Sequence, residues 1–184
     1  GIFAQKARRM IYDIDLWDEA TAENTIDAYN EYLAKSEIKI FDKEAKDAID
    51  ACLWSKAKQE DTIDAYNEYL SESTRKIFET EAKDAIDACL WLKARQADTI
   101  NAYNEYLSES TRRIFEAEAN NAIDACLWSK AKQANTIDSY NEYLSESKWN
   151  RFETEANNAI CEIRSAEEWK HMKNSSDISE IESF

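Results

Sequence analysis

The chain has 184 residues, no proline, a single glycine at position 1 and a formal net charge of −15. Without internal glycine or proline it has no glycine-rich loop to cradle a phosphate, and its composition favours helix throughout. Its negative charge would repel a phosphate backbone, and no apolar run approaches the roughly 20 residues that span a bilayer. We therefore expect neither nucleic acid nor membrane as a partner.

One phrase of sequence, DTIDAYNEYLSES at positions 61–73, occurs four times with small changes. The spacing of Trp17, Trp54, Trp91 and Trp128 gives a period of 37 residues. A unit of this length suits a pair of helices, so the sequence predicts an all-α fold, an α-solenoid of stacked antiparallel helix pairs. A single array is expected over residues 1–184, made of a half repeat at 1–15, full repeats at 16–52, 53–89, 90–126 and 127–163, and a partial repeat at 164–184.

The first 15 residues resemble the second half of a unit, and residues 176–184 resemble the first half. We therefore expect a segment of a longer protein that starts within a second helix and stops within a first one. Such ends would expose apolar side chains. Two outcomes stay open: end-to-end self-association through these ends, or a monomer kept apart by its charge.

The first helix of each full unit is expected to begin directly after a residue that favours the N-cap, with Asp or Asn three places on as a partial capping box. Its apolar residues share one face of a helical wheel, with Tyr66 at the centre and Tyr69 at the edge. We expect core positions for both, although an edge tyrosine also suits a binding face. The predicted N-cap residues are Asn24, Asp61, Asp98 and Asn135.

The second helix is predicted over about residues 74–93 of the second unit. Trp91 and Ala94 fall off its apolar stripe, so we expect both to contact the neighbouring repeat, with the tryptophan packed between repeats. The stripe itself should pack against the first helix. It consists of Phe78, Ala82, Ala85, Ile86 and Cys89.

The helix-pair pattern resembles tetratricopeptide-type repeats. It is more similar to divergent bacterial helical repeats with the pattern W-x2-A, D/N-T, Y-x2-Y-L and F-x3-A, here WSKAKQEDTIDAYNEYLSESTRKIFETEA at 54–82. Such repeats occur in large multidomain proteins, sometimes beside caspase-like protease domains. The resemblance implies a scaffold and carries no catalytic residue. The chain departs from the pattern where SES replaces the Pro or Gly that commonly follows Y-L.

Three of the cysteines recur at one position in successive units. Equivalent residues of stacked helices lie about 10 Å apart, too far for consecutive disulfides, and zinc would need ligands closer in sequence. We expect small buried thiols, and a cytoplasmic location. The cysteines are Cys52, Cys89 and Cys126, while Cys161 stands two places early.

Other reactive side chains form no catalytic pattern. Residues 13–19 resemble the start of a calcium loop but lack its turn glycine and its final glutamate. Carboxylate pairs such as Asp84 with Asp87, or Glu79 with Glu81, are expected on a solvated helix face, and His171 on the surface. We therefore expect no enzyme activity, no cofactor and no metal.

The sequence thus favours a non-catalytic protein-interaction or scaffold module. In arrays of the type it resembles, the first helices line the concave face, which would make an acidic groove suited to a basic protein or peptide. Two alternatives stay open: a regulatory arm of a multidomain enzyme, such as a caspase-like protease, whose catalytic domain lies outside this chain, or a spacer without a specific ligand. The candidate partner-binding residues are Asp27, Asn30 and Glu31, Asp64, Asn67 and Glu68, Asn101, Asn104 and Glu105, and Asp138, Asn141 and Glu142.

Overall fold

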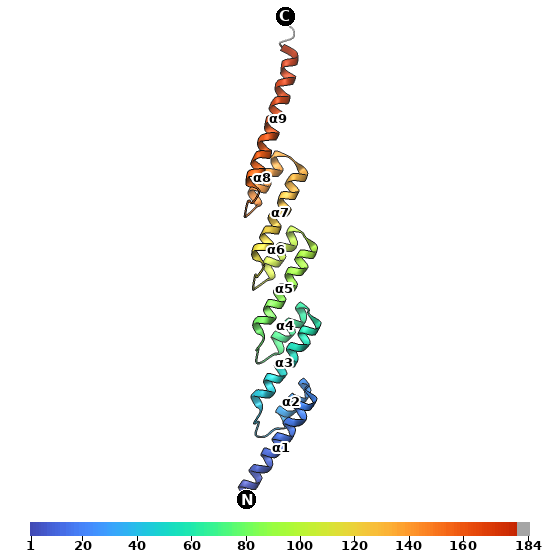
Figure 1. Ribbon diagram of the computed structural model, residues 1–184, viewed down its shortest axis with the longest axis vertical. Helices are drawn as coiled ribbons and strands as arrows, with labels where there is room; N and C mark the ends of the chain where they lie inside the picture. The colour runs from blue at the N-terminus through green and yellow to red at the C-terminus, as the bar shows by residue number, and fades with distance from the viewer. Residues whose placement is uncertain (180–184) are drawn as a thin grey trace. The chain divides into compact units, whose positions relative to one another are not determined.

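The computed structural model describes the backbone of residues 1–179 and the side chains of residues 1–173. This part of the chain contains nine α-helices and no strand, which confirms the predicted all-α class (Figure 1). Long helices alternate with short helices of 10 residues. In chain order they are α1 (Ile2–Glu23), α2 (Ile26–Lys35), α3 (Asp42–Glu60), α4 (Ile63–Glu72), α5 (Glu79–Ala97), α6 (Ile100–Glu109), α7 (Glu116–Ala134), α8 (Ile137–Glu146) and α9 (Glu153–Ser179).

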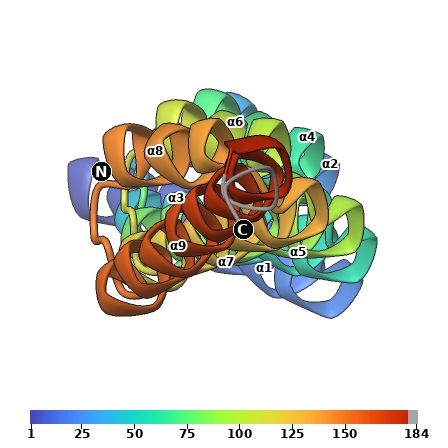
Figure 2. The same ribbon diagram turned by 90° about the horizontal axis from the view of Figure 1, so that it is seen from above.

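Contacts divide the chain into two units, and the division falls inside α5. The N-terminal unit holds Gly1–Leu90 with Ser110–Arg112, and the C-terminal unit holds Trp91–Glu109 with the described residues from 113 onward. Within the first unit α2 packs against α1 and α3, and within the second α8 packs against α7 and α9. In each unit the short helices lie along one edge and the long helices along another, as the view from above shows (Figure 2). Each unit thus stacks its helices in chain order, as expected of an α-solenoid.

The helix starts differ from the predicted ones by one residue. Thr62 is the N-cap of α4, and its hydroxyl accepts a hydrogen bond from the Ala65 amide at 3.2 Å. Asp61 instead ends α3 in the left-handed conformation, with φ at 49°, and its carboxylate accepts a hydrogen bond from the Tyr66 hydroxyl at 2.7 Å. Aspartate and asparagine tolerate this conformation better than most residues, which explains their recurrence here. The same correction holds for Asn24, Asp98 and Asn135.

The predicted capping box is also wrong. The residue that faces the N-cap lies three places after the threonine, and it is alanine in three of the four repeats. Only α8, among the described helices, has a reciprocal box, in which Thr136 and Ser139 exchange hydrogen bonds at 3.1 Å.

The second helix starts later than predicted. Residues 73–78 form a loop, and α5 begins only at Glu79. The predicted stripe is correct in part: Ala82 is fully buried, but Phe78 and Cys89 are only partly buried. Leu90 and Ala94, which the stripe omits, are 6% and 2% exposed. The burial of Ala94 agrees with its expected contact to the neighbouring repeat. Leu90 was missed because a helical-wheel stripe assumes one packed side, whereas a long helix such as α3 packs against a short helix on each of two sides.

The aromatic residues confirm the predicted core. Tyr66 and Tyr69 are 4% and 1% exposed. Trp54 of α3 stacks on Phe78 with ring centres 5.4 Å apart and 12° between the planes, and it contacts both tyrosines at 5.7 and 5.4 Å. The tryptophan therefore links one long helix to the next, as its position off the stripe predicted. The other three 37-residue repeats contain the same cluster.

Several smaller predictions have mixed outcomes. Residues 13–19 lie inside α1 and form no loop, and His171 is exposed as expected. The four cysteines are free, but three are partly buried and Cys161 is exposed, so fully buried thiols were a wrong expectation. Helix α9 continues to Ser179, so no new first helix begins near residue 176, and the rest of that prediction lies outside the described residues.

Candidate functional site

The twelve candidate partner-binding residues all lie exposed on the short helices. Each short helix turns its tyrosines into the core and the predicted polar triad toward solvent. The N-terminal unit carries the triads of α2 and α4, and the C-terminal unit those of α6 and α8. The sequence periodicity therefore predicted correctly that these residues are exposed to solvent.

The triads are less acidic than their residues alone indicate. Glu68 accepts an ion-pair hydrogen bond from Lys56 of α3 at 2.7 Å. Glu105 and Glu142 repeat this contact with Lys93 and Lys130 at 2.9 and 2.7 Å. The hydrogen bond to glutamate raises the pKa of each of these lysines. These pairs are exposed, so they contribute little to stability but reduce the negative charge presented by each triad.

A groove runs beside the first triad, between the start of α2 and the middle of α3. It has a volume of about 730 Å³, and its lining includes Asp27 but neither Asn30 nor Glu31. Small side chains, among them Ala48 and Cys52, line the α3 side. The structure thus connects one member of the triad to a concave surface, while the other two lie on the open helix face.

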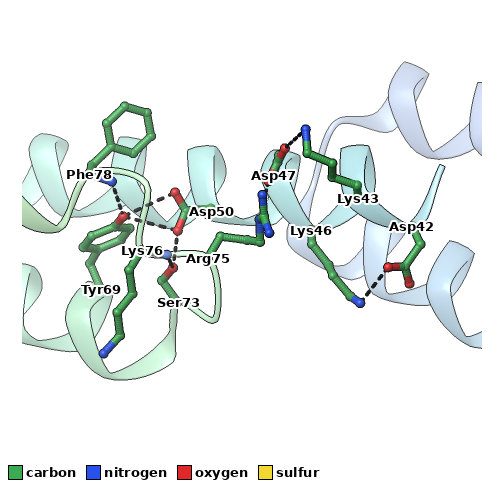
Figure 3. A network of polar contacts seen from close by, with 10 residues as sticks. All are labelled: Asp42, Lys43, Lys46, Asp47, Asp50, Tyr69, Ser73, Arg75, Lys76 and Phe78. Atoms are coloured by element: carbon green, nitrogen blue, oxygen red, sulfur yellow. Dashed lines mark hydrogen bonds and ion pairs between the residues drawn. The ribbon is translucent and has the colours of Figure 1, made fainter.

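A buried polar network, which the sequence interpretation missed, holds the short helices α2, α4 and α8 to the long helix before each of them. Asp50 of α3 is 1% exposed and accepts hydrogen bonds from the Tyr69 hydroxyl, at 3.2 and 3.3 Å, and from the Ser73 hydroxyl. The Tyr69 hydroxyl accepts the Phe78 amide at 2.8 Å, and the Ser73 hydroxyl accepts the Lys76 amide at 2.7 Å (Figure 3). We call this network the Asp–Tyr–Ser clamp.

The clamp recurs at Asp13 and Asp124, and Asp87 accepts the equivalent hydrogen bond from the Ser110 hydroxyl. These three aspartates are each 1–2% exposed. Asp87 was predicted on a solvated helix face, and that prediction is wrong, because the loop after the following short helix folds back over the aspartate. Asp84 and Glu79 are only partly exposed and Glu81 is exposed, so the prediction holds fully for Glu81 alone.

Burial of the Asp13 carboxylate acts to raise its pKa, but four donated hydrogen bonds together hold the pKa below its ordinary value. Multiple donors stabilise a buried carboxylate in this way without a cationic partner. Burial also raises the pKa of the clamp tyrosines Tyr32, Tyr69 and Tyr143. The donors to Asp13 are the hydroxyls of Ser36 and Tyr32 and the amides of Ile40 and Lys39.

The clamp also explains how the SES turn works without glycine. Lys76 adopts a left-handed φ of 51°, which disfavours a residue with a side chain by about 1 kcal/mol. Its amide is fixed by Ser73 and the Phe78 amide by Tyr69, so the loop keeps this conformation. The same φ occurs at Lys39, Arg113 and Asn150, with values of 46–56°.

The side chains of the described residues include no group of three or more histidine, cysteine, aspartate or glutamate residues arranged to hold a metal ion. None of the described helices combines the length and the apolar character needed to cross a membrane. Comparisons with protein families, with characterised proteins and with solved structures gave no match.

Proposed function

We propose that this chain is a non-catalytic, cytoplasmic protein-interaction module that works as a scaffold segment of a larger protein. The observation that carries the proposal is the repetition of one exposed polar triad on the short helices α2, α4, α6 and α8. Within each unit, a ligand that contacts one triad can contact the other in the same way, so weak contacts add to one binding energy.

The proposed ligand is a basic protein or peptide. The first residue of three of the four triads is an aspartate that remains exposed beside the lysine–glutamate pairs. These aspartates are Asp27, Asp64 and Asp138. A net charge of −15 would speed the approach of a cationic segment and disfavour anionic competitors. The groove beside Asp27 gives such a segment a concave surface on α2 and α3.

Selection from a library of displayed peptides tests this proposal. We expect the wild-type chain to select peptides enriched in lysine and arginine. A variant with Asp64, Asn67, Asn104 and Asn141 all changed to alanine should bind them at least about tenfold more weakly, since a few contacts carry most of an interface energy. Alanine favours helix, so the variant should keep the wild-type circular dichroism.

Two results would contradict the proposal. Peptides that bind the alanine variant as tightly as the wild type would place the binding site elsewhere. Failure to select any peptide would instead favour a spacer that sets length and has no specific ligand.

A further inference from the structure

Two successive loops between a short helix and the next long helix form the same ion pair in the N-terminal unit. Arg75, in the loop before α5, forms an ion pair with Asp47 of α3 at 2.5 Å. One repeat later Arg112 forms the same ion pair with Asp84 of α5, also at 2.5 Å. Each pair connects the loop to the preceding long helix.

The C-terminal unit changes both partners of this pair. Asn121 stands where the two preceding repeats have aspartate, and Trp149 stands where they have arginine. The arginine–aspartate pair is therefore replaced by a neutral amide and an aromatic ring. Arg151 donates a hydrogen bond to the Asn121 side chain at 3.2 Å, but Trp149 remains 47% exposed.

A groove of about 590 Å³ lies at this altered junction. Its apolar lining comes from Ile114, which is 49% exposed, from Trp149 and from Ala117 of α7. Two large apolar side chains exposed on one groove are typical of a contact surface for a partner, and tryptophan is enriched among the residues that dominate such surfaces.

The polar lining of the groove favours anions. Arg113 and Lys148 contribute two positive charges, and Glu116 contributes one negative charge, which lies 3.7 Å from Arg113. The side-chain amide of Asn120 is turned back to the Glu116 carbonyl at 2.7 Å. The lining thus carries a net positive charge in a chain whose overall charge is −15.

The groove is also held in place before any ligand arrives. The loop that carries Lys148 and Trp149 belongs to a clamp: the Ser147 hydroxyl accepts the Asn150 amide at 2.8 Å, and the Tyr143 hydroxyl accepts the Phe152 amide at 2.9 Å. A surface that is already ordered loses little conformational entropy on binding.

We propose that this groove binds a short segment of a partner protein in which an aromatic side chain is flanked by carboxylates. The aromatic ring packs between Trp149 and Ile114, and the carboxylates face Lys148 and Arg113. Ring stacking and ion pairing both suit such a segment. This site goes beyond the proposed function, because it lies on the loops instead of the short-helix triads and takes a ligand of opposite charge.

Fluorescence anisotropy with a fluorescein-labelled peptide, Asp-Glu-Asp-Phe-Asp-Glu-Asp, tests the proposal on the intact chain. We expect saturable binding at near-physiological salt that weakens as salt rises. The matched variant is Asn121→Asp combined with Trp149→Arg, which restores the ion pair of the earlier repeats and should therefore fold. It should bind the peptide at least about tenfold more weakly, as expected when a central tryptophan is lost.

Further variants separate this site from the triads. Lys148→Glu should weaken binding of the acidic peptide, whereas the alanine variant of the triads should leave it unchanged. Replacing the phenylalanine of the peptide by glycine should also weaken binding.

Four results would overturn the proposal: no binding of the acidic peptide, equal binding by the restored-pair variant, equal binding of a peptide with lysine in place of the acidic residues, or sedimentation data in which the restored-pair variant turns an oligomer into a monomer. The last result would make the groove a contact between two copies of this chain.

Discussion

The clamp predicts that two tyrosines on the same helix differ sharply in their importance for stability. In Tyr69→Phe the buried carboxylate of Asp50 loses one hydrogen bond, and the Phe78 amide loses its acceptor. A hydrogen bond to a charged group contributes about 1.5–3 kcal/mol, and a buried amide without a partner costs about 1–3 kcal/mol. We therefore expect Tyr69→Phe to lower the free energy of unfolding by about 3 kcal/mol.

Tyr66→Phe is the matched control, since it removes the same atom from the same helix. The Tyr66 hydroxyl donates only to Asp61, which is exposed and can bind water instead. Its loss should cost about 0.5–1 kcal/mol. Urea unfolding followed by circular dichroism measures both values. Equal losses for the two variants, or a loss below about 1 kcal/mol for Tyr69→Phe, would show that the clamp does not hold the helices together.

Three further predictions concern acid stability, loop strain and thiol reactivity. The folded-state pKa of Asp13 lies below its ordinary value of 3.8. The stability that its carboxylate contributes is therefore present above pH 3.8 and is lost as the pH falls through the folded-state pKa. Asp13→Asn should accordingly flatten the dependence of melting temperature on pH below about 4. Lys76→Gly should stabilise the chain by roughly 0.5–1 kcal/mol, because glycine adopts the left-handed φ at this position without strain. Lys83→Gly inside α5 should destabilise it by about 1 kcal/mol. Changes of the same sign in the free energy of unfolding of the two variants, measured in urea, would contradict the loop geometry. Cys161 is the exposed cysteine, and burial raises the pKa of the other three thiols, so iodoacetamide should alkylate one thiol quickly in the native chain, and Cys161→Ser should remove that fast phase.

The repeat pattern was enough to predict the helix pairs, the buried faces of the short helices and the exposure of the triads. Each of these depends on local periodicity: an apolar residue every three or four places faces the core whatever the neighbouring element is. The linking role of Trp54 could be predicted for the same reason, because its angle on the helical wheel differs from that of the main stripe.

The clamp and the groove depend on contacts between residues far apart in the sequence. Asp50 is an aspartate on a helix whose other carboxylates are more exposed, so helix periodicity alone predicts a solvent-exposed position for it. It is buried because Tyr69 and Ser73, 19 and 23 positions later, return over it. The sequence did contain one indication of this burial. Aspartate recurs at all four positions equivalent to Asp50, whereas the more exposed position of Asp47 and Asp84 changes to asparagine at residue 121.

The sequence by itself therefore determined the helical array and the orientation of its faces, since these follow from the 3.6-residue period and from helix-favouring composition. Only the tertiary structure decided which polar residues are buried and where the surface opens. Burial of Asp87 needs the loop that follows α6, and Trp149 is 47% exposed because it lies at a loop position that is also exposed at Arg75 and Arg112. Both depend on distances between separate elements, which a periodic pattern along one helix does not contain.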